Sequence, residues 1–201
     1  MQVVPIEHGI TLAQSAPGYV RTPGLHISAM YNSLYAALEP ERYGGTDGPD
    51  PLKLELGMAF EERLERGVKA QWGGRRPGEF TTAEGIIYSP DWISFEDGKL
   101  VVGEFKLTWQ SSRAVPREPT TTFPPRMSKW LTQIKSYAFH LETCYARLYV
   151  LFVNGPYSKE DGMNPELLCW NLVFTQRDLE DNWQGLCNHA RHVGLLPIGP
   201  L

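Results

Sequence analysis

The stretch that decides the fold is PDWISFEDGKLVVGEFKLTW, residues 90–109. Two apolar runs in it are joined by Asp97-Gly98, a dipeptide that favours a tight hairpin turn. In the second run, a period of two places Glu104 and Lys106 on one face, and both faces also carry apolar residues. Apolar residues on both faces predict a central strand. A carboxylate and an ammonium group side by side on such a strand are costly unless they serve a purpose.

The sequence around this hairpin predicts an α/β fold in which helices flank a mixed central β-sheet. We expect a single domain over residues 1–201, with a core at about 52–153, an N-terminal arm and helix in 1–50, and a C-terminal strand and helix in 154–201. The first helix runs from near Ser28 to Pro40, with an inward face of Ile27, Met30, Leu34 and Leu38. The later elements, in order, are a helix at 52–72, strands at 83–89, 91–95 and 99–109, a helix at 127–143, strands at 146–155 and 167–174, and a helix at 176–192.

The composition is that of an ordinary globular protein, with 42% hydrophobic and 21% charged residues in a chain of 201. No apolar run reaches the eighteen or so residues that a membrane-spanning helix needs, so we expect no membrane association. The N-terminus lacks a basic start followed by an apolar block, which argues against secretion. Three widely spaced cysteines are too few for a four-thiolate cluster. These features predict reduced thiols and a cytoplasmic location.

The charge distribution is uneven. The net charge of −4 argues against a protein that coats nucleic acid nonspecifically. Residues 109–147, however, carry six Lys and Arg side chains against two Glu. A basic segment beside an acidic site is the layout expected where phosphates approach bound cations. The candidates for phosphate contacts lie in and just after the irregular, proline-rich stretch 110–126: Arg113, Arg117, Arg126 and Lys129. Solvated surface charges are the alternative interpretation of these four residues.

The acidic residues near the hairpin suit a hard divalent cation. Asp91 and Glu104 could each give an oxygen to Mg²⁺ or Mn²⁺. Lys106, on the same face as Glu104, could orient or deprotonate an attacking water, or stabilise the transition state. In the helix at 52–72, Glu61 shares the inward face with Leu64, so it could complete the coordination from a neighbouring element.

Four motifs resemble those of a known family, and they follow one another along the chain as Gly57 with Glu61, Pro90-Asp91, Glu104-Phe105-Lys106 and Gln133 with Tyr137. Pro90-Asp91 followed by Glu104-Phe105-Lys106 resembles the motif that names the PD-(D/E)XK nuclease superfamily. Two other pairs resemble motifs of its branch that contains RecB, Cas4 and lambda exonuclease: Gly57 with Glu61, and Gln133 with Tyr137.

The resemblance implies a restriction-endonuclease-like core and a Mg²⁺- or Mn²⁺-dependent DNA nuclease. In that case Asp91, Glu104 and Lys106 would be catalytic, Glu61 would join both acids as a metal ligand, and Gln133 and Tyr137 would face the site or the DNA backbone. The iron–sulfur cluster of the Cas4 group needs four cysteines, so a chain with three would lack it.

Several alternatives stay open at the level of the sequence. The motifs favour an exonuclease that processes DNA ends in recombination or repair, and the short chain suggests a phage or mobile-element protein. An endonuclease on the same fold is the nearest rival. A non-catalytic relative that binds DNA or protein, and a small-molecule hydrolase on another fold, are further alternatives. A homo-oligomer or a recombination partner protein is also open.

Overall fold

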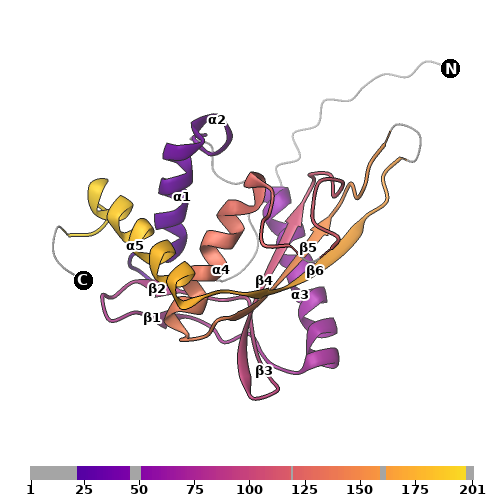
Figure 1. The fold of residues 1–201 in the computed structure, drawn as a ribbon. Helices are drawn as coiled ribbons and strands as arrows, with labels where there is room; N and C mark the ends of the chain where they lie inside the picture. The colour runs from indigo at the N-terminus through magenta and orange to yellow at the C-terminus, as the bar shows by residue number, and fades with distance from the viewer. Residues whose placement is uncertain (1–21, 46–50, 119, 159–161, 198–201) are drawn as a thin grey trace.

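The centre of the molecule is a four-stranded mixed sheet with the strand order β3-β4-β5-β6 (Figure 1). A computed structural model describes residues 22–45, 51–118, 120–158 and 162–197 of the chain. β3 and β4 form the expected antiparallel hairpin, β4 and β5 run parallel, and β5 and β6 are antiparallel. The strands are β3 (Trp92–Glu96), β4 (Lys99–Thr108), β5 (Tyr145–Phe152) and β6 (Glu166–Val173). The predicted mixed sheet between helices is confirmed.

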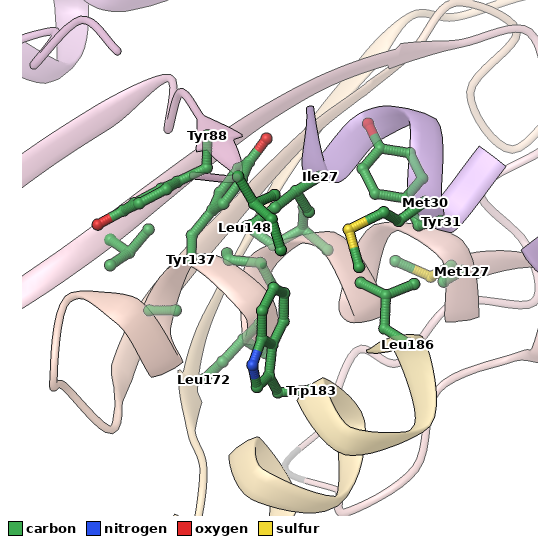
Figure 2. Close-up of a cluster of buried hydrophobic side chains, with 14 of the residues drawn as sticks. Ile27, Met30, Tyr31, Tyr88, Met127, Tyr137, Leu148, Leu172, Trp183 and Leu186 are labelled. Carbon is green, nitrogen blue, oxygen red and sulfur yellow. The ribbon is translucent and has the colours of Figure 1, made fainter. Parts of the chain in front are cut away.

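Helices cover the two faces of this sheet unequally (Figure 1). Three helices, α1 (Ile27–Leu38), α4 (Ser128–His140) and α5 (Gln176–His192), pack together on one face. Their apolar side chains and those of the sheet form the larger core, in which Met30, Leu148 and Trp183 meet (Figure 2). The long helix α3 (Pro51–Trp72) packs against β3 and β4 on the other face. Its smaller core consists of Val68, Trp92, Phe105 and Tyr149.

Local signals explain why several boundaries follow the prediction closely. α5 begins at Gln176 because Thr175 and Asp178 form a reciprocal capping box, in which each side chain bonds the backbone N–H of the other. The hairpin turns at Asp97 and Gly98, both of which have positive φ. Within the described ranges, no helix is both long and apolar enough to cross a membrane.

The prediction for residues 83–89 was wrong. Only Ile87–Tyr88 (β2) forms a strand there, and it pairs with Phe80–Thr81 (β1) in a separate two-stranded sheet. The cause is a tight turn, in which the backbone N–H groups of Gly85 and Ile86 both bond to Thr82. Gly85 has a φ of +79°, a conformation that takes the chain out of an extended strand.

The first helix also differs in detail from the prediction. Leu38, expected to face inward, is 64% exposed, whereas Tyr31 and Tyr35 are buried. Tyr35 can be buried because its hydroxyl lies 3.0 Å from Thr132 Oγ1 on α4, which satisfies the polar end of the ring. Pro40 then opens a short helix, α2 (Pro40–Tyr43), since proline is tolerated at a first helical position.

The stretch 110–126 is irregular as expected, and a single 3₁₀ turn, η1 (Pro125–Met127), begins at its end.

Candidate active site

The candidate site lies where β3 and β4 separate. The last paired residues of the hairpin at this end are Trp92 and Gly103. Pro90 has no backbone N–H, so it cannot extend the ladder. Instead, the Asp91 carboxylate oxygen Oδ2 accepts a hydrogen bond of 2.8 Å from the backbone N–H of Phe105. The side chain of Asp91 thus takes the place of a strand partner and is fixed beside the next residues of β4.

Glu104 is the most deeply buried charged residue of the site. Its side chain is 0% exposed, and its Oε1 accepts a hydrogen bond from the Lys106 ammonium group. Its other oxygen, Oε2, is buried and has no hydrogen-bond partner. Burial, and next the charge of Asp91, raises the pKa of Glu104 to about 8. An unpartnered carboxylate oxygen in the interior is costly, so the position of Glu104 does not favour stability.

Lys106 lies on the same face of β4 and stays charged. Burial alone would lower the pKa of its ammonium group, but the neighbouring carboxylates of Glu104 and Asp91 more than offset this effect, so the pKa is raised. A lysine with a raised pKa is protonated at neutral pH. In this arrangement Lys106 can donate hydrogen bonds and stabilise negative charge, but it does not accept a proton.

Glu61 belongs to α3, which packs on the face of the sheet opposite to α1, α4 and α5, and it approaches the site from there. Burial, and next the nearby charge of Asp91, raises the pKa of Glu61, whereas the positive charges of Arg76 and Lys106 lower it. Glu61 therefore lies within electrostatic reach of Asp91 and Lys106. Its Oε2 is 3.4 Å from Nη2 of Arg76.

The donor set is composed of carboxylate oxygens, which hard cations such as Mg²⁺ and Mn²⁺ prefer. In the part of the chain that the structure describes, no three His, Cys, Asp or Glu side chains stand close enough together to hold a metal ion. The ion pairs explain this spacing, since Glu104 is turned onto Lys106 and Glu61 onto Arg76. The unpartnered Oε2 of Glu104 is nevertheless the kind of atom that a cation would satisfy.

Gln133 and Tyr137 of α4 are buried and bonded to each other. The Gln133 side-chain N–H group donates to the Tyr137 hydroxyl at 3.0 Å. Burial raises the pKa of Tyr137 well above its usual range, and the negative charge of Glu104 raises it further. The phenol of Tyr137 therefore lies near the site, within the larger core (Figure 2), and neither side chain is exposed to a DNA backbone.

The predicted basic segment does not form one surface. Arg117 makes a bidentate ion pair with Glu166, in which Nη1 is 2.5 Å from Oε1 and Nη2 is 2.7 Å from Oε2. Arg147 is similarly paired with Glu96 at 3.0 and 2.7 Å, and it lies over the ring of Trp72. Two of the six positive charges are thus neutralised by carboxylates on the sheet.

The remaining predicted phosphate contacts are placed differently. Arg113 is exposed and donates to the backbone carbonyl of Pro156 at 3.1 Å, and Arg126 donates to that of Ser111 at 2.9 Å. Lys129 lies within electrostatic reach of Lys106: burial lowers the pKa of the Lys129 ammonium group, and the positive charge of Lys106 lowers it further.

Three residues near the site were not predicted from the sequence: Arg42, Tyr43 and Arg76. Arg42 and Lys129 lie over the ring of Tyr43, at 5.1 and 4.4 Å from its centre. Arg76 lies beside Glu61 on the other side. Arg76 stands in the sequence GGRRPG (73–78), whose glycines and proline indicate a loop directly after α3. The composition of this loop could have drawn attention to Arg76. The sequence of α2, which carries Arg42, gives no comparable signal.

Comparison with known proteins supports the fold. No protein-family profile and no curated protein matches the sequence. Among solved structures, a phage-related exonuclease from Haemophilus somnus 129PT is similar, with a TM-score of 0.53 and 13% identity over 83% of this chain and 79% of that chain. An alkaline exonuclease from Laribacter hongkongensis has a TM-score of 0.50 and 12% identity over 86% of this chain and 88% of that chain. The chain therefore shares the α/β fold of these exonucleases.

Proposed function

We propose that this protein is a divalent-metal-dependent deoxyribonuclease of the PD-(D/E)XK superfamily, which hydrolyses phosphodiester bonds at DNA ends. The observation that carries the proposal is the environment of Glu104: a fully buried carboxylate with one oxygen on Lys106 and the other without a partner. Asp91 is fixed beside it by the Phe105 N–H. A stability role alone does not account for two carboxylates and a lysine gathered at the separating end of a hairpin.

Asp91 and Glu104, with Glu61 from α3, would hold Mg²⁺ or Mn²⁺. When bound, such a cation supplies a water of lowered pKa and neutralises charge on the phosphate. Lys106 remains protonated, because the two neighbouring carboxylates raise its pKa. Its role is then to orient the water or a phosphate oxygen by donating a hydrogen bond, and not to act as the general base.

The DNA backbone would approach on the side where Lys129 and Arg42 lie over Tyr43. Lys129 is half-buried, close to Lys106 and Arg42, so its positive charge lies where a phosphate is attracted to the site. Arg126 and Arg113 would contact phosphates further along the strand. Arg117 would contribute only if DNA displaced it from Glu166.

An exonuclease is favoured over an endonuclease because two solved structures that share the fold are exonucleases. Processing of DNA ends in recombination or repair, in a phage or mobile element, is the corresponding biological role. A non-catalytic DNA- or protein-binding relative is the second candidate, but such a protein would not need the charged cluster to be retained.

The test incubates the protein with linear, nicked, circular and single-stranded DNA in Mg²⁺, Mn²⁺ or EDTA. We expect cleavage of linear DNA in the presence of either cation and none in EDTA. Cleavage of closed circles would replace the exonuclease proposal with an endonuclease. No metal-dependent cleavage of any of the four substrates would contradict the nuclease proposal itself.

A further inference from the structure

The loop after α3, residues 73–78, is hydrogen-bonded to β3, the edge strand of the sheet. The backbone N–H and carbonyl of Arg75 pair with those of Ile93 on β3, with both hydrogen bonds at 2.9 Å. Gly74, with a φ of +90°, makes this approach possible: a Cβ there would come within 2.6 Å of Trp92 Nε1 and closer still to the Ile93 carbonyl oxygen. Arg76 follows directly, so its position beside the site is fixed by backbone bonds to β3.

The guanidinium of Arg76 is shared between two carboxylates of α3. Its Nη2 is 3.4 Å from Glu61 Oε2, and its Nε is 3.3 Å from Glu65 Oε2. Each of these two contacts is monodentate and at least 3.3 Å long. By contrast, Arg117 and Arg147 each bind both oxygens of one carboxylate. With its side chain 45% exposed, Arg76 is held loosely and can change partners without breaking a closed ion pair.

The surroundings of this arginine favour a positive ion. A hollow of about 440 Å³ adjoins Arg76 and is open to solvent, so a hydrated cation can reach Glu61 through it. Its walls are formed by Met58, Ala59, Glu61, Glu62, Glu65 and Arg76. Glu62 is paired with Arg66, so Glu61 and Glu65 against Arg76 leave one excess negative charge at this hollow. Arg76 also acts on the strand side of the site, because its charge is one of those that lower the pKa of Asp91 against the larger effect of burial.

We propose that Arg76 is a positioning residue: it is the resident counter-ion of Glu61, and a divalent cation takes over that role when it binds, leaving Arg76 on Glu65. Before the cation arrives, the ion pair holds the Glu61 carboxylate in place and limits the repulsion between it and Asp91. On binding, Glu61 turns to the cation, and Arg76 keeps a carboxylate partner within reach. This inference rests on the metal site of the proposed function. It goes beyond that function because it assigns Arg76 as a competitor of the cation for Glu61.

The expected effect has a sign that distinguishes it from a structural role. A unit positive charge about 6 Å from a dication opposes its binding by about tenfold in affinity even in water-like surroundings. Removal of Arg76 should therefore tighten metal binding. A residue that merely supported the fold would weaken metal binding, or leave it unchanged, when replaced.

The experiment titrates Mn²⁺ by calorimetry into the wild type, Arg76→Gln, Arg76→Lys and Arg75→Gln, in the absence of DNA. Arg75→Gln is the matched control: it is the adjacent exposed arginine, it removes the same charge, and it keeps the backbone bridge to Ile93. We expect Kd to fall about tenfold in Arg76→Gln, to return toward the wild-type value in Arg76→Lys, and to change little in Arg75→Gln. Thermal unfolding of each variant in EDTA confirms that it is folded.

Unchanged or weaker binding by folded Arg76→Gln, or equal tightening by Arg75→Gln, would overturn this inference while leaving the proposed function intact. Wild-type protein that binds no Mn²⁺ at millimolar concentrations would overturn both together. The two failures are therefore distinguishable in one set of titrations.

Discussion

At the residue scale, the main feature of the site is Glu104, which is fully buried, contacts Lys106 and has one carboxylate oxygen without a partner. The alternation of β4 predicted that Glu104 and Lys106 share one face, and the structure places them in contact there. The sequence could not show the unpartnered oxygen or the capping of Phe105 N–H by Asp91, because both depend on where β3 stops. Arg76 was missed for the same reason, since its position depends on a bridge between a loop and a strand edge.

The raised pKa of Glu104 predicts a pH-dependent cost to stability. The folded protein keeps a proton on Glu104 up to about pH 8, whereas the unfolded chain releases it near pH 4.3. The free energy of unfolding therefore falls as pH rises through this window. We expect Glu104→Gln to be more stable than the wild type at pH 8 in EDTA, by about 4 kcal/mol, and by only about 1 kcal/mol at pH 5. Chemical denaturation at both pH values measures this, and a variant less stable at pH 8 would contradict it.

At the element scale, the β3–β4 hairpin positions the site. The sequence predicted this hairpin, the helix α5 and the strand β5, because each has a clear period and clear ends. It failed at residues 83–89, where a local turn bonded to Thr82 overrides the strand-like composition. Gly103 has a role that only the structure reveals: it lies opposite Trp92, and a Cβ on it would come within 2.8 Å of Trp92 Cβ.

We therefore expect Gly103→Ala to destabilise the protein by about 1–3 kcal/mol through overpacking. Because Trp92 follows Asp91, the same change should also lower the rate of DNA cleavage. The control is Gly67→Ala on α3, where a Cβ would meet nothing within 4 Å. That substitution should stabilise the helix by about 0.5–1 kcal/mol and leave cleavage unchanged. Unfolding curves and cleavage rates of both variants test this; two stabilised, active variants would refute the role of Gly103.

At the scale of the whole molecule, the site joins two halves of the fold that have cores of unequal size. Asp91, Glu104 and Lys106 belong to the sheet, whose larger core is shared with α1, α4 and α5. Glu61 belongs to α3, which is fastened by the smaller core around Val68 and Trp92. The element with fewer buried contacts is expected to open first.

Amide hydrogen exchange should show this difference. We expect the amides of α3 to exchange faster than those of α4 in EDTA, because the smaller core gives less protection. Saturating Mn²⁺ should slow exchange in α3, since Glu61 would then tie this helix to the sheet residues through the cation. Equal protection of the two helices, with no response of α3 to Mn²⁺, would contradict this account of the two halves.

The central claim is that the buried carboxylate of Glu104 is catalytic, and one comparison tests it most directly. Single-turnover cleavage of linear duplex DNA in Mg²⁺ is measured for the wild type, for Glu104→Gln, and for Glu180→Gln, an exposed residue of α5 that loses the same charge. Loss of a metal-binding catalytic carboxylate should slow cleavage by about a thousandfold or more. We predict that loss for Glu104→Gln alone, with Glu180→Gln as active as the wild type. Undiminished cleavage by folded Glu104→Gln would contradict the claim.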